Sequence, residues 1–456
     1  MYNVTVPTAE HTYRYLEPSS VHETGEQAEV SLATSGGAAT NPYFFTGFLA
    51  GPRQTSQALL VVAEVARTRY YEPPNMVAAR IAAADPVVTS NLDRLRFESF
   101  SACAGVYARL DLEPGVLDGR PRGWGTTNVD FNPPMRAALA RVHDDEAMLM
   151  HVGHDEVRVE TLAGSAVERK VPLPERWLKG FAEVQVTSAQ MVLRHELPSV
   201  EARRFLQSLP RTRSRAVAWA TPAGRGLRLA SRPTDAAVCL AGPERLRLLE
   251  KLLPFARGLR AYGPAPGARR SAEPSAWELE LDGARVVFGL SPELFRGFSG
   301  EGGVLTDLAT ADDEVVEQVA DSLHGEPTID TDEVSRTTGV GRTDVQTALG
   351  ALGAAGRVGF DLGKCAYFHR ELPYDRAALE GMHPRLLGAR ELVEQGAVRL
   401  SEHGGVVRSG DAEYVVRLED GVLRCTCIWF AKHRGERGPC KHVLAVQHAR
   451  REARVP

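Results

Sequence analysis

The spacing of apolar and polar residues predicts a chain that mixes helices and strands. The segment ALLVVAEVARTRYY at residues 58–71 places its apolar residues at helical intervals, which predicts a buried helix. Residues 1–40 are mostly polar and lead into a Gly- and Asn-containing stretch, which predicts a flexible N-terminal arm. We therefore expect an α+β region that begins near residue 41 and extends to about residue 300.

This region contains a weak internal repeat. The first copy, at 101–185, holds GVYARL, TNVDFNPPMRAALARV, a strand-rich segment and LPERWLKGF. The second, at 213–300, holds AVAWAT, AAVCLAGPERLRLLEKLL, a strand-rich segment and LSPELFRGF. Each copy has proline at the start of a predicted helix, where its missing N–H costs nothing. The period is far longer than that of a solenoid, so we predict two similar α+β units, with chance similarity as the alternative.

The pattern changes in residues 311–372. DDEVVEQVADSLHG, DTDEVSRTTGV and GRTDVQTALGALGAAGR predict three short helices, and VGFDLGKCAYFHRELP predicts a two-stranded hairpin around Gly363. Three helices followed by a hairpin resemble a winged helix-turn-helix. Residues 373–400 are expected to supply a connecting helix and strand.

The third of these helices is poor in side chains that contact DNA. Between Thr343 and Ala355, only Asp344 is charged and only Gln346 carries an amide, and Arg342 and Arg357 lie at the ends. A helix that reads the major groove normally presents several Arg, Lys, Asn or Gln side chains. We therefore expect this winged-helix-like domain to pack or to dock proteins rather than to read a base sequence.

Composition restricts the class of protein. The 456 residues are 43% hydrophobic and 25% charged, with a net charge of −4, so any basic nucleic-acid site must be local. The chain has no apolar stretch long enough to span a membrane, and its first residues lack the pattern of a secretion signal. We expect no membrane partner and a cytoplasmic location.

Two segments raise the question of catalysis. HDDEAMLMHVGHDE contains His143, His151 and His154 beside five carboxylates, but the spacing matches no zinc site, and two solvated turns around a short strand are the simpler interpretation. GFSGEGG at 297–303 fits no phosphate-binding or nucleophile motif and predicts a linker. We therefore predict no enzyme activity, with a hydrolase or nuclease hidden in residues 41–300 as the remaining alternative.

Half of the six cysteines lie in CTCIWFAKHRGERGPCKH at residues 425–442. The preceding AEYVVRLEDGVLRC predicts a hairpin that turns at EDG, so its second strand delivers Cys425 and Cys427. The following CKHVLAVQHARREAR predicts a helix with Cys440 and His442 in its first turn. Three thiolates and one imidazole can converge on a single tetrahedral zinc ion. The remaining cysteines are expected to be buried free thiols: Cys103, Cys239 and Cys365.

The spacing C-x-C, twelve residues, C-x-H, with YVVRL before it and PCKHVLAV around its end, resembles the SWIM zinc-finger family, and the longer chain resembles its actinobacterial members. The resemblance implies a C-terminal ββα zinc finger within residues 401–456. It also implies one zinc ion per chain. The implied ligands are Cys425, Cys427, Cys440 and His442. A proline often follows the second cysteine in this family; Ile428 stands there, which affects the loop and not ligation. His433 and His448 do not reproduce the C-x-H spacing and are expected at the surface.

The resemblance also implies a nucleic-acid or protein partner. Residues 421–456 carry eight Lys and Arg against two Glu, a net charge of +6 in an otherwise acidic chain. We therefore expect a non-enzymatic adaptor that contacts DNA or RNA mainly through phosphates, with a protein scaffold in a bacterial multi-protein system as the alternative. Two alternative roles apply to these residues. Trp429 could pack over the zinc site instead of stacking on a base. The last arginines could interact with the negative end of the helix dipole instead of with phosphates. The candidate contacts are Arg424, Lys432, Arg434, Arg437, Arg450, Arg451 and Trp429.

Overall fold

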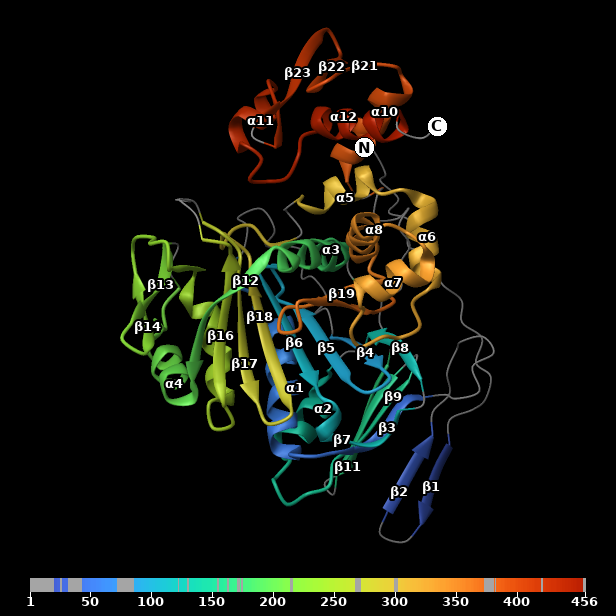
Figure 1. The fold of residues 1–456 in the computed structure, drawn as a ribbon. Helices are drawn as coiled ribbons and strands as arrows, with labels where there is room; N and C mark the ends of the chain where they lie inside the picture. Colours follow the sequence, from blue (N-terminus) through green and yellow to red (C-terminus); the bar gives the residue numbers. More distant parts are fainter. Residues whose placement is uncertain are drawn as a thin grey trace, which may run out of the picture.

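The computed structural model (Figure 1) describes residues 20–24, 27–31, 43–71, 86–121, 123–128, 131–153, 156–161, 164–169, 173, 175–213, 216–266, 272–298, 302–372, 381, 383–419 and 421–453. Most of the predicted N-terminal arm lies outside these ranges. Within the arm, β1 (Ser20–Thr24) and β2 (Gln27–Ser31) form an antiparallel hairpin, which the sequence pattern did not predict.

The largest sheet has eight antiparallel strands. In spatial order these are β12 (Met191–Pro198), β16 (Gly258–Pro264), β17 (Ser275–Leu281), β18 (Ala284–Leu290), β6 (Val106–Leu112), β5 (Leu95–Phe100), β4 (Val87–Asn91) and β8 (Trp124–Asn128).

Two smaller sheets flank the large one. The first runs in the order β11 (Gly164–Arg169), β10 (Glu156–Thr161), β9 (Leu149–Gly153), β3 (Tyr43–Leu49) and β7 (Leu117–Pro121), and a 3₁₀ turn, η1 (Pro114–Val116), precedes β7. The second runs β14 (Gly226–Ala230), β13 (Val217–Ala223), β15 (Val238–Ala241).

Four helices cover one face of these sheets: α1 (Pro52–Arg67), α2 (Pro133–Ala140), α4 (Ser199–Ser208) and the 3₁₀ helix η2 (Pro243–Leu252). Helix α1 confirms the predicted buried helix but begins earlier, at a proline, which is favourable in the first turn. Leu59, Leu249, Phe97 and Trp277 belong to the core between helices and sheet. Strand residues alternate between the two faces, so this core uses every second position.

The opposite face of the large sheet is covered by α3 (Glu175–Ala189) and by the hairpin of β19 (Val358–Asp361) and β20 (Ala366–His369). Trp177 and Phe181 of α3 pack edge-on against Phe100 of β5. The sheet therefore lies between two layers, one of four helices and one of α3 with the hairpin.

The topology contains a repeat built on exchanged strands. A first half, from β3 to β11, and a second half, from β12 to β18, each hold two strand–helix–strand units. In each half, the first strand of one unit pairs with the later strands of the other: β3 with β9, β8 with β4, β12 with β16, and β15 with β13. The halves are joined by the pairing of β18 with β6.

This arrangement agrees with the predicted duplication of α+β units, although each predicted copy begins inside a half. The helices α2 and η2 occupy equivalent places, each opened by proline as predicted. The segments predicted to close both copies differ, because LPERWLKGF enters α3 whereas residues after Leu290 form turns with a Glu293–Arg296 bridge. The domain limits drawn from sequence remain predictions.

Residues 304–369 contain α5 (Val304–Thr310), α6 (Asp313–Asp321), α7 (Thr331–Thr338), α8 (Arg342–Ala354) and then the β19–β20 hairpin. The three predicted helices are α6, α7 and α8, and the predicted hairpin follows them. Side chains Asp312 and Asp330 cap α6 and α7 by accepting backbone N–H groups. The order of elements is that expected of a winged helix, and the assignment itself remains a proposal.

The C-terminal part forms a separate sheet with helices beneath it. Helix α10 (Pro384–Glu394) leads into a sheet of β21 (Val398–Ser401), β22 (Gly404–Ser409), β23 (Ala412–Glu419) and β24 (Val422–Cys425), followed by α11 (Ile428–His433) and α12 (Lys441–Glu452). Leu444 of α12 and Val407 of β22 share one core with Leu308 of α5 and Ala182 of α3. Helix α5 lies between the C-terminal part and the body (Figure 1), and its apolar residues share one core with both.

None of the helices in the described part of the chain is both long and apolar enough to cross a bilayer.

Candidate metal centre

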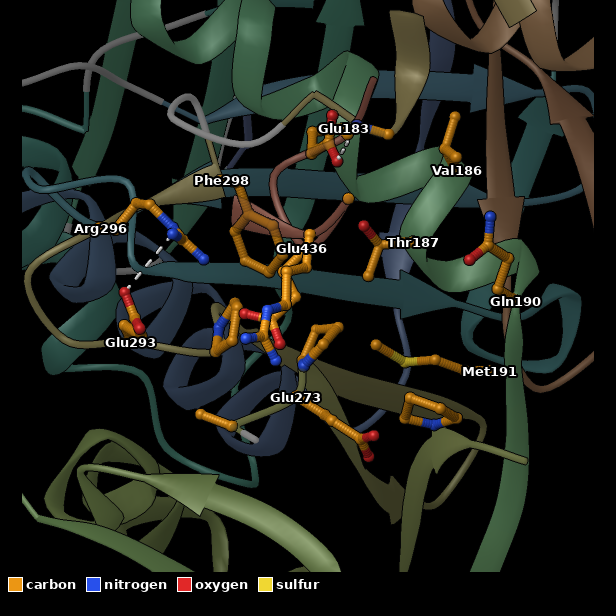
Figure 2. Close-up of a pocket in the computed structure, with 18 of the residues that line it drawn as sticks. Glu183, Val186, Thr187, Gln190, Met191, Glu273, Glu293, Arg296, Phe298 and Glu436 are labelled. Carbon is orange, nitrogen blue, oxygen red and sulfur yellow. Dashed lines mark hydrogen bonds and ion pairs between the residues drawn. The ribbon is translucent and has the colours of Figure 1, made fainter. Parts of the chain in front are cut away.

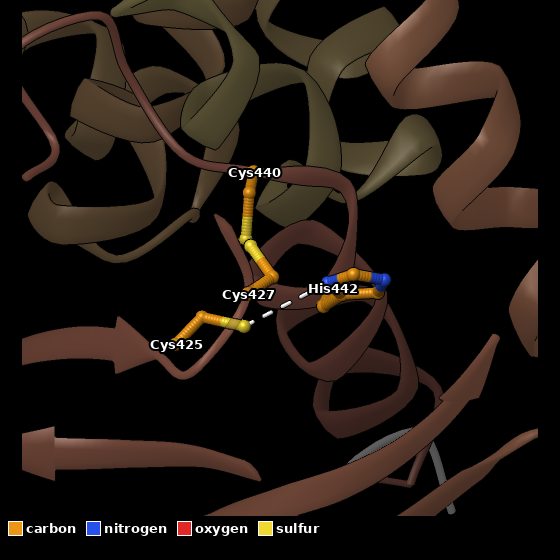
Figure 3. Close-up of side chains that lie close together, drawn as sticks. All are labelled: Cys425, Cys427, Cys440 and His442. Atoms are coloured by element: carbon orange, nitrogen blue, oxygen red, sulfur yellow. Dashed lines mark hydrogen bonds between the residues drawn. The ribbon is translucent and has the colours of Figure 1, made fainter. Parts of the chain in front are cut away.

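Four side chains from the C-terminal part converge on one point (Figure 3). Cys425 ends β24, Cys427 is the N-cap of α11, Cys440 is the N-cap of α12, and His442 lies in the first turn of α12. The β23–β24 hairpin turns at Gly421, whose φ of 78° suits glycine. These positions confirm the predicted hairpin, helix and ligand set.

The four ligand atoms lie within 4.8 Å of one another, and all four residues are buried. The Sγ of Cys425 lies 3.7 Å from Nδ1 of His442. Two such ligands on one tetrahedral zinc ion would be about 3.5 Å apart, given Zn–S near 2.3 Å and Zn–N near 2.0 Å. The residues present therefore fit a single zinc ion, with Nδ1 as the atom of His442 that would bind the metal.

Neighbouring groups fix the orientation of these ligands. The ring of Tyr414 stacks on His442 with centroids 4.2 Å apart and planes inclined by 16°. The backbone N–H of Phe430 donates to Sγ of Cys427 at 3.4 Å. Ile428 is the first residue of α11, where proline is also tolerated, so the departure from the family pattern leaves ligation intact.

The thiols are coupled by hydrogen bonding. A hydrogen bond from Cys425 lowers the pKa of Cys440 to about 4, and the same interaction raises the pKa of Cys425. Zinc binds thiolates, so metal affinity at this site is expected to rise with pH as the remaining protons are released.

The other histidine and cysteine candidates take no part in the centre. His433 lies beside Trp429, with ring centroids 4.8 Å apart, and His448 approaches Glu452 at 3.7 Å. Cys103 is partly exposed and Cys239 is buried. Cys365 is exposed, which contradicts the expected burial, because the turn between β19 and β20 carries its side chain to the surface.

The histidines of residues 143–156 do not form a second centre within the described chain. His143 is exposed, whereas His151 lies on β9 with Nδ1 3.2 Å from Oγ1 of Thr46. The short strand predicted between two turns is β9. His154 falls outside the described residues. No metal-binding group was found around them among the residues that the structure describes.

The predicted nucleic-acid contacts separate into two groups. Arg450 donates to the carbonyl oxygens of Ser401 and Glu402 at 3.0 and 2.9 Å, and Arg451 donates to that of Ala311. These two arginines therefore hold α12 to its neighbours, and their contact with nucleic acid stays a prediction. Arg424, Lys432 and Arg434 are exposed, although Arg424 pairs with Glu419 at 3.4 Å.

The side chain of Trp429 packs against neighbouring residues instead of projecting into solvent. The guanidinium of Arg385 lies over its ring, 4.7 Å from the centroid, and the His433 ring lies beside it, tilted by 53°. Trp429 and Phe430 both border the core of the C-terminal part. Because its ring is engaged in this way, we assign Trp429 a packing role, the competing interpretation to base stacking.

The structure adds two cations that sequence reasoning missed. The pKa of His433 is lowered first by partial desolvation and then by four surrounding cations: Arg437, Lys432, Arg296 and Arg385. Arg385 comes from α10 and Arg296 from the segment after β18, so no local pattern joins them to the loop. We call residues 428–439 the zinc loop, and the cations around His433 together with Arg434 the basic cluster.

A cavity of about 690 Å³ lies where the zinc loop meets the body (Figure 2). Glu183, Met191 and Phe298 line it from the body, and Arg434 and Glu436 from the zinc loop. Glu183 is itself fixed, because it accepts the N–H of Gly303 at 2.9 Å at the start of α5. The zinc loop is therefore part of an interface within the chain.

The winged-helix-like segment is docked on the large sheet. Asp361 of β19 is buried and forms ion pairs with Arg285 at 2.8 Å and Arg109 at 3.4 Å. In α8 the predicted apolar residues Val345, Leu349 and Leu352 are buried. A hairpin and helix engaged in this way favour the packing role expected from sequence.

Comparison with known proteins supports the C-terminal assignment. Residues 414–450 match the family model of the SWIM zinc finger, so the chain carries a SWIM zinc finger there, with Cys425, Cys427, Cys440 and His442 placed for one zinc ion. No curated protein sequence matches the chain.

Solved structures that superimpose on the chain include two of PCNA type. One is Proliferating Cellular Nuclear Antigen from Entamoeba histolytica, with 11% identity and a TM-score of 0.35. Another is the PCNA2–PCNA3 complex from Sulfolobus tokodaii, with 8% identity and a TM-score of 0.39. Each comparison covers 55% of this chain and 99% of the other.

Proposed function

We propose that this chain is a zinc-dependent, non-enzymatic adaptor whose SWIM module contacts DNA or RNA mainly through phosphates. The observation that carries the proposal is the basic cluster: Lys432 and Arg434 are exposed on the zinc loop, and Arg296 of the body lines the same cavity as Arg434. Arg296 already pairs with Glu293 at 3.6 Å, whereas Lys432 and Arg434 are exposed on the zinc loop, where the phosphate backbone of a nucleic acid can supply their counter-charge.

The zinc ligands are positioned to fix this cluster. The zinc loop begins directly after Cys427 and ends directly before Cys440, so both of its ends are anchored at the metal centre. Arg385 adds a third anchor by donating to the carbonyl oxygens of Arg437 and Pro439 at 2.7 and 2.9 Å. Bound zinc would therefore be a condition of phosphate binding without touching the phosphates.

Phosphate contact, rather than base reading, suits the available elements. In the described part of the module, α12 is packed between α10, α5 and the sheet. Helix α11 has only six residues, about 9 Å, which is too short to follow a groove. Weak sequence preference is therefore expected.

A protein scaffold is the second candidate, favoured by a different observation. The side chains of Leu418 and Val422, beside the β23–β24 turn, are 42% and 57% exposed. Exposed apolar residues at a hairpin tip suit a protein partner better than a phosphate backbone.

A binding titration with matched variants tests the main proposal. Replacing Lys432, Arg434 and Arg437 together with Gln should weaken binding to DNA and RNA of any sequence. The salt dependence should also fall, by roughly one unit of log–log slope for each phosphate that the variant no longer neutralises. The control replaces Arg399, Arg408 and Arg417 with Gln. These exposed residues alternate with buried positions of the sheet and point away from α12, so the same charge change should have little effect.

Zinc content is measured in both triple variants, because loss of the metal would also weaken binding. If the zinc-loaded wild type forms no complex with any nucleic acid at low salt, the proposal is wrong. If the two triple variants weaken binding equally, the basic cluster is not the contact surface.

A further inference from the structure

A large apolar side chain projects into solvent beside the basic cluster. Ile428 is 86% exposed, more than any other large apolar side chain in the described chain; the next is Phe295 at 63%. Single exposed apolar residues are common, but an isoleucine this open at the start of a helix is not explained by packing. The adjacent Trp429 and Phe430 border the core instead, so α11 turns Ile428 outward.

Helix geometry places Ile428 on the same face as a cation. Lys432 follows four residues later, one turn along α11, and is exposed. Arg434 follows at the end of the helix with a left-handed φ of 50°, and its side chain is also exposed. Among the described residues, neither Lys432 nor Arg434 has a carboxylate partner.

The two kinds of side chain make different contacts with a nucleic acid. Cations bind phosphates of either a duplex or a single strand. An apolar side chain beside these cations can pack on the face of a base. That face is accessible in a single strand but is covered by stacking inside a duplex. The duplex has the denser array of phosphates, and the described elements of the module offer no free helix for its groove, so a preference for the single strand depends on the base contact of Ile428.

Resting on the proposed function, we propose that the surface formed by Ile428, Lys432 and Arg434 binds single-stranded DNA or RNA in preference to duplex. The cations contact successive phosphates, and Ile428 packs on an unstacked base between them.

Fluorescence anisotropy of the full-length, zinc-loaded protein tests the preference. The probes are a labelled, unstructured mixed-sequence DNA strand of about 20 nucleotides and the same strand annealed to its complement, at about 20 mM salt. We expect roughly tenfold tighter binding of the single strand. Ile428→Ala should weaken single-strand binding about fivefold and leave duplex binding unchanged.

Leu400→Ala is the matched control, because Leu400 of β21 is an exposed apolar residue in the sheet of the C-terminal part, and it should alter neither affinity. Equal binding of both probes, or an unchanged single-strand affinity in Ile428→Ala with normal zinc content, would overturn the inference while leaving the proposed function standing. Absence of binding to both probes would instead refute the proposed function.

Discussion

The guanidinium of Arg385 lies 4.7 Å from the centre of the Trp429 ring while donating two hydrogen bonds to backbone carbonyls of the zinc loop. One side chain of α10 thereby holds both ends of this loop, the helical start through Trp429 and the end through Arg437 and Pro439. The loop is positioned by the body as well as by the metal ligands.

Replacing Arg385 with Ala should therefore loosen the zinc loop. We expect a loss of about 2 to 3 kcal/mol of unfolding free energy, because two charged hydrogen bonds and a cation–π contact disappear. Urea denaturation of the zinc-loaded protein measures this loss. Arg399→Ala is the control, since its exposed ion pair with Glu413 should contribute less than about 1 kcal/mol. Equal effects of the two variants would contradict the role given to Arg385.

Metal content should follow the four ligands. We expect one zinc ion per chain in the wild type by elemental analysis, and none in Cys440→Ser or His442→Ala, because three ligands do not complete a structural site. Cys365→Ser, which removes the exposed thiol outside the centre, should retain zinc. Intact reduced protein without zinc would contradict the assignment.

Removal of zinc should disturb more than the finger. Because Leu308 and Leu444 share one core, chelation should increase hydrogen exchange in residues 304–310 as well as in 422–452. The strands β5 and β6 should remain protected, since their core is separate. Exchange confined to the residues around the ligands would show that α5 does not transmit the effect of zinc removal.

Asp361 should be important for stability and for its pH dependence. Burial raises its pKa, but Arg109 and Arg285 outweigh burial and hold the pKa of Asp361 well below its usual range. A depressed carboxyl pKa stabilises the fold above the unfolded value of about 3.9 and loses this effect as the pH falls below it. Asp361→Asn should thus cost about 3 to 5 kcal/mol at pH 7, because buried arginines lose their counter-charge.

The difference between wild type and Asp361→Asn should shrink as denaturation is repeated at pH values below about 4. Asp411→Asn, at an exposed turn, should show no such difference at any pH. A gap that stays constant with pH would mean that the ion pairs of Asp361 do not stabilise the hairpin.

The zinc ligands could be predicted because their information is local. Cys425 and His442 lie within one short segment, and thiols at that spacing have few alternative explanations. The helices α6 to α8 were likewise evident from apolar periodicity and flanking aspartates. Helix α11 was missed because six residues between β24 and a glycine-containing turn are too few to show a helical period.

Long-range contacts could not be predicted in this way. Arg296 enters the basic cluster only through the packing of the zinc loop on the body. Arg450 looked like a surface cation, yet its hydrogen bonds to Ser401 and Glu402 carbonyls depend on where β21 ends. The pairing of each first strand with the other unit of its half could not be predicted for the same reason. The apolar pattern of a strand does not specify which strand it pairs with.

The exchanged first strands have a consequence for how the chain is made. β3 must pair with β9, roughly 100 residues later, so during translation it waits about 5 to 20 s for its partner at usual elongation rates. During that interval it presents an open edge and apolar side chains such as Phe45 to other chains. Neither unit of a half can complete its sheet alone, so shortening the chain inside a half should give aggregation rather than a smaller domain.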